Sequence, residues 1–193
     1  FNWGFWSEAE PNINDRLIDV SRGKTIGGSS SINGMIYVRG NACDLDQWEE
    51  LGAQGWGYRN CLPYYKKAEN CAYGEDEYRG GEGPLHTCNG NGMKNPLYRA
   101  FIEAGGEAGY GITDDYNGYR QEGMCRMDMT VKNGVRCSTA NAYLKPVLHR
   151  SNLTLLMHAL TKKVVLEGKK AVGVEFERDG KTHIVKANRE VIL

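Results

Sequence analysis

Helix-type patterning appears in two short stretches within the first seventy residues. In residues 44–51, Asp44 can cap a helix, Gln47 stands three positions later to complete the cap, and Gly52 provides a stop signal. A second helix is predicted near residues 62–69. Residues 72–92 are rich in Gly, Asn, Asp and Glu, which indicates a surface excursion with room for one short strand at residues 84–88.

The clearest helix signal begins at Asn95-Pro96, a capping residue followed by proline at the first helical position. Its adjacent glycines, Gly105 and Gly106, weaken the helix and favour close packing of a neighbouring segment. Its apolar positions are Leu97, Phe101, Ala104 and Ala108.

Strand-type patterning follows. Residues 124–131 look strand-like, Asn133-Gly134 is a hairpin signal, and Ser138 or Thr139 can cap a short helix through Leu144. The last forty residues predict an antiparallel meander with turns at Glu167-Gly168 and Asp179-Gly180. The strand candidates are residues 153–156, 164–166, 171–176 and 182–186, followed by a final strand at 190–193 that stops inside its own apolar run.

Composition narrows the class of protein. The 193 residues are 40% hydrophobic, which allows one or two domains with a core, and the net charge of zero argues against a nucleic-acid partner. The longest apolar runs are too short to span a bilayer, and no signal-peptide pattern opens the chain. The six cysteines show no C-x-x-C spacing, so we expect free thiols in a reducing compartment and no metal site.

Both ends look cut. The first residue is not Met, and the last apolar run would leave an exposed strand edge. We therefore expect an internal piece of a longer protein. The aromatic residues near the start, Trp3, Phe5 and Trp6, are expected to be core material.

Residues 23–40 carry the strongest sign of chemistry. Gly27 and Gly28 allow positive φ and close approach of another molecule, and three serines follow with hydroxyls and backbone N–H groups that can face an anion. Asn33-Gly34 then turns the chain into an apolar run. Taken alone, this run fits a surface turn as well as a phosphate or cofactor cradle.

Other candidate groups are weaker. The four histidines are widely spaced and have no Asp or Cys at ligand spacing, so we expect structural or solvent-facing roles. The serines do not lie in a G-x-S-x-G motif, which argues against a hydrolase nucleophile. Asp114-Asp115 is most simply a solvated turn.

The loop nevertheless resembles the glucose–methanol–choline (GMC) family of FAD oxidoreductases. The matching positions are Gly23, Gly27, Gly28, Ser29, Ser30, Ile32, Asn33, Tyr37, Gly40 and Asp46. The resemblance extends over essentially the whole chain and is strongest to the choline-oxidising branch. The segments that carry it are residues 22–46, 80–84, 113–118, 121–123 and 136–144.

The resemblance implies an FAD site on the glycine–serine loop. The pyrophosphate and isoalloxazine ring would be contacted by Gly27, Gly28, Ser29, Ser30, Asn33, Gly34, Met35 and Ile36, with backbone near Leu160 or Thr161 at the adenine end. Some relatives attach the flavin covalently through a histidine just before the Asn. Ile32 occupies that position here, so we expect non-covalent FAD. The G-x-G-x-x-G fingerprint and the catalytic histidine would lie outside this chain, and we name no catalytic residue.

The implied fold class is mixed α/β: a Rossmann-like FAD-binding domain with a β-meander, plus part of a GMC substrate-binding domain. Residues 1–65 and 152–193 are expected in the FAD-binding domain and residues 66–151 in the substrate domain.

The implied activity is hydride transfer from a primary alcohol to flavin N5, most simply choline to betaine aldehyde in glycine betaine biosynthesis, with a membrane quinone or other electron acceptor. The fragment alone is expected to be inactive. We expect the parent protein in the cytoplasm or peripheral on the inner face of a membrane, and not secreted. Two alternatives stay open: a GMC oxidase that passes electrons from another alcohol to oxygen, and a binding or scaffold remnant without chemistry.

Overall fold

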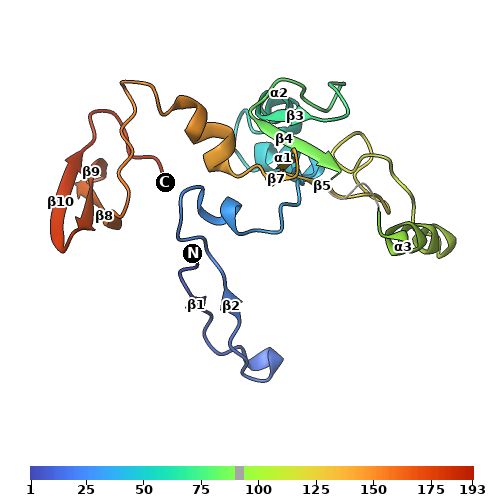
Figure 1. The fold of residues 1–193 in the computed structure, drawn as a ribbon, viewed down its shortest axis with the longest axis horizontal. Coiled ribbons are helices and arrows are strands. Elements are labelled where there is room, and N and C mark those ends of the chain that lie inside the picture. Colours follow the sequence, from blue (N-terminus) through green and yellow to red (C-terminus); the bar gives the residue numbers. More distant parts are fainter. Residues whose placement is uncertain (90–93) are drawn as a thin grey trace. The chain divides into compact units, whose positions relative to one another are not determined.

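The computed structural model describes residues 1–89 and 94–193, and residues 1–147 and 148–193 form two compact units (Figure 1). The first unit holds three helices, several short strands and short helical turns. Its helices are α1 (Ala42–Glu50), α2 (Tyr58–Ala68) and α3 (Pro96–Glu107). Its strands are β1 (Phe5–Trp6), β2 (Asp19–Val20), β3 (Glu69–Cys71), β4 (Leu85–Asn89), β5 (Asp128–Met129), β6 (Val131–Lys132) and β7 (Val135–Arg136). Its short helical turns are η1 (Pro11–Ile13), η2 (Gly28–Ser31), η3 (Ala140–Leu144) and η4 (Lys145–Val147).

Side chains satisfy the first backbone N–H groups of both α1 and α2. The side chain of Asn41 accepts a hydrogen bond from Cys43 N–H and so caps α1, which makes the prediction of Asp44 as the cap wrong. Asp44 lies instead in the first turn, where its charge suits the helix dipole. Asp46 of α1 accepts a hydrogen bond from Tyr58 N–H at 2.8 Å and so satisfies the first turn of α2. Helix α2 begins four residues before its predicted start.

Helix α3 forms as predicted. Asn95 Oδ1 accepts from Leu97 N–H at 3.0 Å, and Pro96 occupies the first turn. A Cβ on Gly105 would lie 2.5 Å from Met124 Cγ, and one on Gly106 would lie 2.9 Å from Ile112 Cδ1. The predicted close packing at these two glycines is therefore confirmed.

A small mixed sheet lies beside α2 (Figure 1). Strand β4 is its centre, pairing parallel with β3 and antiparallel with β5. The strand predicted at residues 84–88 is confirmed as β4, whereas the stretch 124–131 is divided between β5 and β6. Asn133 and Gly134 both have positive φ, which matches the twist of the β6–β7 hairpin, so this turn is confirmed.

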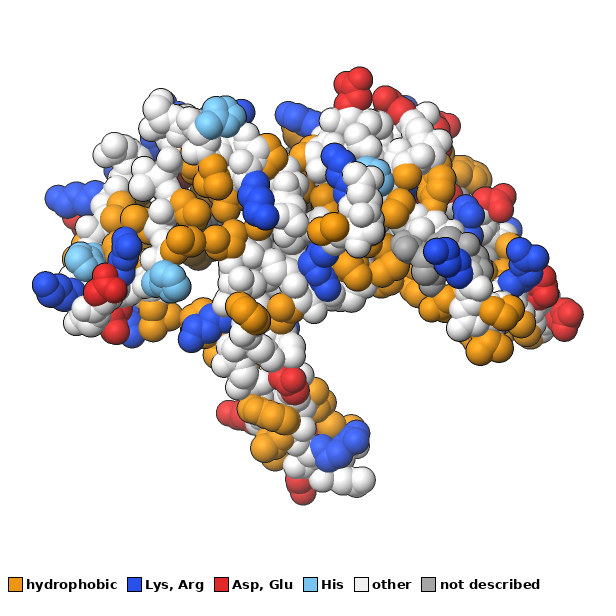
Figure 2. Space-filling model, in the orientation of Figure 1, with side chains coloured by type: hydrophobic (Ala, Val, Ile, Leu, Met, Phe, Trp, Pro, Cys, Tyr) orange, Lys and Arg blue, Asp and Glu red, His pale blue; other side chains and the backbone are white. Residues whose placement is uncertain are grey.

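The aromatic residues near the N-terminus were expected in the core, and this prediction is wrong. Trp3, Phe5 and Trp6 are exposed. Phe5 and Trp6 form β1, which pairs with the two residues of β2, and such a narrow ribbon cannot bury both of its faces. Trp3 instead stacks on Phe5 and lies under the Lys24 ammonium. Figure 2 shows hydrophobic side chains reaching the surface in several places.

The second unit is an antiparallel meander, as predicted. Its strands are β8 (Leu160–Glu167), β9 (Lys170–Arg178) and β10 (Lys181–Lys186). Both predicted turns are present, with positive φ at Gly168, Asp179 and Gly180. The strands predicted at 153–156 and 190–193 do not form, because these residues join no strand ladder in the described part of the chain. No helix within residues 1–89 and 94–193 is long and apolar enough to cross a membrane.

Candidate functional site

The glycine–serine loop folds into a short 3₁₀ turn, η2, that depends on glycine at three positions. Gly27 and Gly28 have φ of 86° and 54°, in the left-handed region. A Cβ on Gly23 would lie 2.2 Å from the Gly28 carbonyl oxygen, so this residue must also be small. A side chain on Gly27 would collide with Ser31 Oγ and press on Ala140.

The serine hydroxyls hold the loop together. Ser29 Oγ accepts from Gly23 N–H at 3.1 Å, and Ser31 Oγ donates to the Ile26 carbonyl at 2.8 Å. Ser30 Oγ donates to the Gly27 carbonyl and accepts from Thr139 N–H at 2.9 Å. These bonds within the chain rigidify the loop and leave its backbone to face a ligand.

Bare backbone faces open space at two points of this loop. A Cβ on Gly28 or on Gly34 would meet no atom within 4 Å. A bound molecule can therefore approach the peptide backbone at both positions without a side chain between them.

The turn after Asn33 carries local strain. Met35 has φ of 65°, a left-handed conformation that a residue with a side chain rarely adopts. Asn33 Oδ1 accepts from Met35 N–H at 3.0 Å, and the Met35 carbonyl accepts from Thr130 N–H at 2.8 Å. These bonds compensate the strain, and strained residues of this kind cluster at ligand sites.

Met35 and Ile36 line a largely apolar cavity of about 820 Å³. Residues of α3 and of the segment from Cys125 to the β6–β7 hairpin complete its wall. The lining comprises Met35, Ile36, Asn89, Tyr98, Phe101, Ile102, Cys125, Arg126, Met127, Met129, Val131, Gly134 and Arg136. Its volume suits a small organic ligand or one ring system of a larger one. Its charged lining residues, among those described, are two arginines.

Residues 37–39 are fixed by a second segment far along the chain. Asn117 Nδ2 donates to the Tyr37 carbonyl at 3.1 Å, and Asn117 Oδ1 accepts from Arg39 N–H at 2.9 Å. Tyr116 Oη also donates to the Tyr37 carbonyl, at 2.6 Å. Burial raises the pKa of Tyr116 to about 12. The hydrogen bond that Tyr116 Oη accepts from Asp128 N–H lowers this pKa and so offsets part of the effect of burial.

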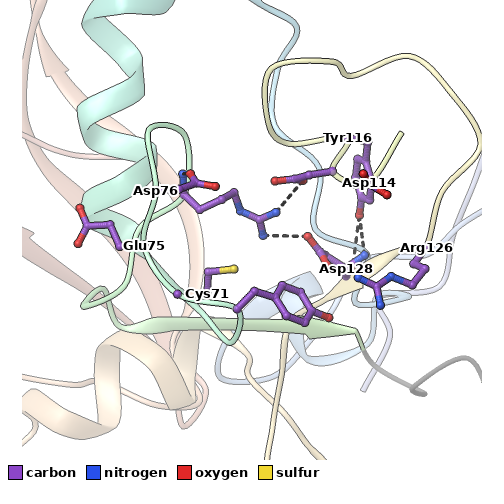
Figure 3. A pocket seen from close by; sticks show the side chains of 11 residues that line it. Cys71, Glu75, Asp76, Asp114, Tyr116, Arg126 and Asp128 are labelled. Carbon is purple, nitrogen blue, oxygen red and sulfur yellow. Dashed lines mark hydrogen bonds and ion pairs between the residues drawn. The ribbon is translucent and has the colours of Figure 1, made fainter. Parts of the chain in front are cut away.

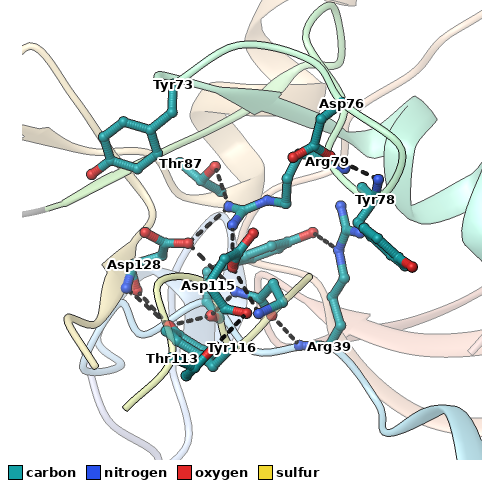
Figure 4. Close-up of polar contacts among 12 residues, drawn as sticks. Arg39, Tyr73, Asp76, Tyr78, Arg79, Thr87, Thr113, Asp115, Tyr116 and Asp128 are labelled. Carbon is teal, nitrogen blue, oxygen red and sulfur yellow. Dashed lines mark hydrogen bonds and ion pairs between the residues drawn. The ribbon is translucent and has the colours of Figure 1, made fainter. Parts of the chain in front are cut away.

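A buried cluster of charges underlies this contact (Figure 4). Arg79 pairs with Glu69 at 2.7 Å, with Asp128 at 2.8 Å and with Asp115 at 2.8 Å. Glu69 pairs with Arg39 as well, at 2.6 Å, and is fully buried. Burial by itself favours the neutral carboxyl, but hydrogen bonds from Arg79 and Thr87 and the charges of both arginines outweigh it, so the pKa of Glu69 is lowered.

Asp115 corrects an earlier expectation. The pair Asp114-Asp115 looked like a solvated turn, and Asp114 is indeed exposed. Asp115, however, is half-buried, pairs with Arg79 and accepts from Asn117 N–H at 2.8 Å. Its neighbourhood forms a polar pocket of about 330 Å³ between Tyr73, Asp76 and Arg126 (Figure 3). Because Arg79 in its wall is committed to three carboxylates, we assign this pocket a structural role.

The residues predicted to bind FAD fall into two groups. Those from Gly27 to Ile36 lie together on one loop of the first unit. Thr161 lies in the second unit, on β8, where it is exposed and pairs with Phe176 next to a register shift. The role of each remains a prediction.

Sequence reasoning missed the residues that support the loop. Arg136 donates to the Asn33 side chain, and Thr139 bonds both Ser30 and Gly27. Tyr116 and Asn117 likewise support residues 37–39, by donating hydrogen bonds to the Tyr37 carbonyl. Residues 113–118 and 136–144 are both parts of the family resemblance. However, more than a hundred residues separate Arg136 from Asn33, and no local sequence pattern links the two.

The chain is similar to proteins of known name over its whole length. It is 58% identical over 193 residues to an oxygen-dependent choline dehydrogenase of Vibrio vulnificus and 56% identical to one of Rhizobium etli. All of this chain is covered, but only 34% and 35% of those proteins, so the chain spans about a third of the length of the curated relatives it matches.

Solved structures agree with this fold. A pyridoxine 4-oxidase from Mesorbium loti superposes with a TM-score of 0.86 at 31% identity, covering 98% of this chain and 38% of that one. An FAD-dependent oxidoreductase from Chaetomium thermophilum gives 0.86 at 26% identity, covering 97% and 35%. The family model described as GMC oxidoreductase matches residues 8–193. The mixed α/β fold and the resemblance on the glycine–serine loop are thus confirmed, and the chain belongs to the GMC oxidoreductase family.

Proposed function

We propose that this chain is the central part of a longer FAD-dependent oxidoreductase that acts on the CH–OH group of an alcohol. One observation carries the proposal. The loop from Gly27 to Ile36 is rigid by its own hydrogen bonds, yet presents bare backbone at Gly28 and Gly34 beside an apolar cavity. That arrangement suits a flat ligand with an anionic tail.

The residues present fit FAD. Gly28 and Gly34 allow close approach of the cofactor, Asn33 supplies a carboxamide, and Met35 and Ile36 supply an apolar wall for a flavin ring. Ile32 has no atom that could bond the flavin, so the cofactor is held without a covalent link. When bound, FAD supplies the acceptor for a hydride from the alcohol carbon. The residues of this chain bind the cofactor, fix its position and exclude water from one side.

Choline is the proposed substrate because the curated relatives carry that name at 54–58% identity. Among its described lining residues, the cavity wall offers two cations, Arg126 and Arg136, and no carboxylate. A quaternary ammonium group would be repelled there. We therefore propose that residues outside this chain hold the ammonium, while this chain contributes to the cofactor site.

A second candidate is an oxidase acting on a neutral alcohol. The apolar, cationic cavity lining favours it, and the pyridoxine 4-oxidase shows that the fold occurs with another named activity. The relatives' name favours oxygen as the electron acceptor. A quinone would instead bring the parent protein to the inner face of a membrane, and co-sedimentation with quinone-loaded vesicles distinguishes the two.

The domain organisation also remains a proposal. We assign residues 1–65 and 152–193 to the FAD-binding domain and residues 66–151 to the substrate domain. The boundary between the two compact units lies instead near residue 147. Hydrogen bonds from Tyr116 and Asn117 to the Tyr37 carbonyl join residues 37–39 to the middle of the chain within the first unit.

Gly34→Ala tests the cofactor site in the full-length protein that carries this chain. Gly34 does not have positive φ and its Cβ position is free, so stability should stay within about 0.5 kcal/mol of wild type. The new methyl group lies where we place the cofactor, so FAD affinity should fall at least about tenfold, measured by flavin fluorescence titration.

Gly106→Ala is the control, since it also adds one methyl group at a glycine without positive φ, but on α3, where it meets only the flexible tip of Ile112. Equal FAD affinity in wild type and Gly34→Ala would refute this placement. Flavin absorbance that bleaches with choline supports the dehydrogenase, rapid peroxide formation with a neutral alcohol supports the oxidase, and failure to bind flavin supports an inactive remnant.

A further inference from the structure

Arg136 contacts the glycine–serine loop at Asn33, two residues before the left-handed Met35. Its Nη1 donates to the Asn33 carbonyl at 2.8 Å, to Asn33 Oδ1 at 2.8 Å and to the Ser30 carbonyl at 3.3 Å. Arg136 comes from β7, at the end of the Asn133-Gly134 hairpin, so a tight turn places its Cα. Asn141 Nδ2 donates to the Arg136 carbonyl at 2.9 Å and further fixes the backbone there.

These contacts determine which way the Asn33 carboxamide faces. Both of its partners, Arg136 Nη1 and Met35 N–H, are donors and approach the same atom, Oδ1. An amide turned the other way would place its own N–H groups against them. The oxygen is therefore held inward, and the NH2 group, a donor only, is directed away from both.

We propose that Arg136 is a positioning residue that orients Asn33, so that the Asn33 NH2 group donates a hydrogen bond to an acceptor atom of the bound cofactor. This inference rests on the proposed function, which places the cofactor on this loop. The acceptor belongs to a carbonyl oxygen or ring nitrogen of the flavin. The same contacts keep Met35 in its left-handed conformation, with its side chain in the cavity wall.

Arg126 provides a matched control for charge. It lines the same cavity and carries the same charge, but its guanidinium lies over the Tyr73 ring and not on the loop. An effect of positive charge on the cofactor would appear in Arg126→Met and Arg136→Met alike. An effect of loop geometry would appear only in Arg136→Met.

The first measurement is amide hydrogen exchange of residues 33–38 in the full-length protein without cofactor. Arg136→Met should speed exchange on the order of tenfold or more, because a charge-assisted contact is lost, while Arg126→Met stays within about twofold of wild type. Equal exchange in both variants would overturn the positioning role. Arg136→Lys keeps the charge and should restore part of the protection, which separates loop loosening from general unfolding.

The second measurement uses Asn33→Asp. The carboxylate retains the oxygen that receives Arg136 and Met35, so exchange at residues 33–38 should stay as slow as in wild type. The outward NH2 group becomes a negative oxygen, so FAD affinity should fall tenfold or more and the visible flavin band should shift. FAD binding equal to wild type would refute donation by Asn33. If the wild-type protein binds no flavin, the proposed function fails, and the exchange experiment still decides whether Arg136 holds the turn.

Discussion

Replacing Glu69 by Gln tests whether the buried charge cluster stabilises the first unit. Glu69 is fully buried and accepts hydrogen bonds from Arg39 Nη2, Arg79 Nε and Nη2, Thr87 Oγ1 and Gly80 N–H, at 2.6–3.2 Å. Glutamine has nearly the same shape but no charge. Its NH2 group would also face an arginine guanidinium at either oxygen position, and a guanidinium donates but cannot accept.

The cost follows from what the substitution leaves behind. Arg79 keeps two carboxylates, Asp115 and Asp128, but Arg39 pairs with no carboxylate other than Glu69 in the described residues. Its guanidinium, only 1% exposed, would be buried without a counter-charge. Removing one partner of such a pair costs about 3–5 kcal/mol. This is a large share of the roughly 5–15 kcal/mol that stabilises an ordinary domain, and it corresponds to a melting temperature lower by roughly 6–20 °C.

Urea unfolding of the chain, followed by tryptophan fluorescence, measures this cost. Trp48 and Trp56 lie in α1 and just before α2, the helix that contacts β3. Glu75→Gln is the control, because Glu75 pairs with Lys66 at 3.3 Å on the surface of the same unit and should cost less than about 1 kcal/mol. A loss below about 1 kcal/mol for Glu69→Gln, or equal losses in both variants, would refute the reasoning.

Three further outcomes are expected. The pKa of Glu69 is lowered in the folded state, so the stabilisation by its carboxylate is fully present above the ordinary value of 4.5 and is lost as pH falls through the folded pKa. The difference in unfolding free energy between wild type and Glu69→Gln should therefore shrink below about pH 4, as measured by unfolding at a series of acid pH values. The pKa of Tyr116 is raised to about 12, so its contribution to stability is fully present below the ordinary value of 10.0 and is lost as pH rises from there through about 12. Tyr116→Phe should cost about 1–3 kcal/mol at neutral pH and remove the latest step of the phenolate absorbance titration. Gly105→Ala should destabilise by about 1–3 kcal/mol because its Cβ would collide with Met124 Cγ. Gly106→Ala meets only the flexible tip of Ile112 and gains helix propensity of up to about 1 kcal/mol, so its thermal unfolding should stay near that of wild type.

Local signals predicted local structure well. Asn95-Pro96 begins α3, and Asn133-Gly134 forms the β6–β7 turn, because capping and positive φ depend only on a few adjacent residues. Asp44 failed as a cap because Asn41, three residues earlier, already satisfies the first turn of α1. Residues 153–156 failed as a strand because alternation identifies an extended, apolar segment but supplies no partner backbone.

The sequence by itself determined the family and the glycine–serine loop with its two left-handed glycines. Steric limits on φ act within a residue, and a long motif is specific even without coordinates. Only the tertiary structure decided what holds that loop. Arg136 reaches Asn33 across 103 residues, and Arg79 pairs with Asp128 across 49. A charge has many possible partners along a chain, and which one it meets depends on the segments that folding brings together. Tertiary packing thus gave Asp115, Asn117 and Arg136 roles that their neighbours in sequence could not indicate.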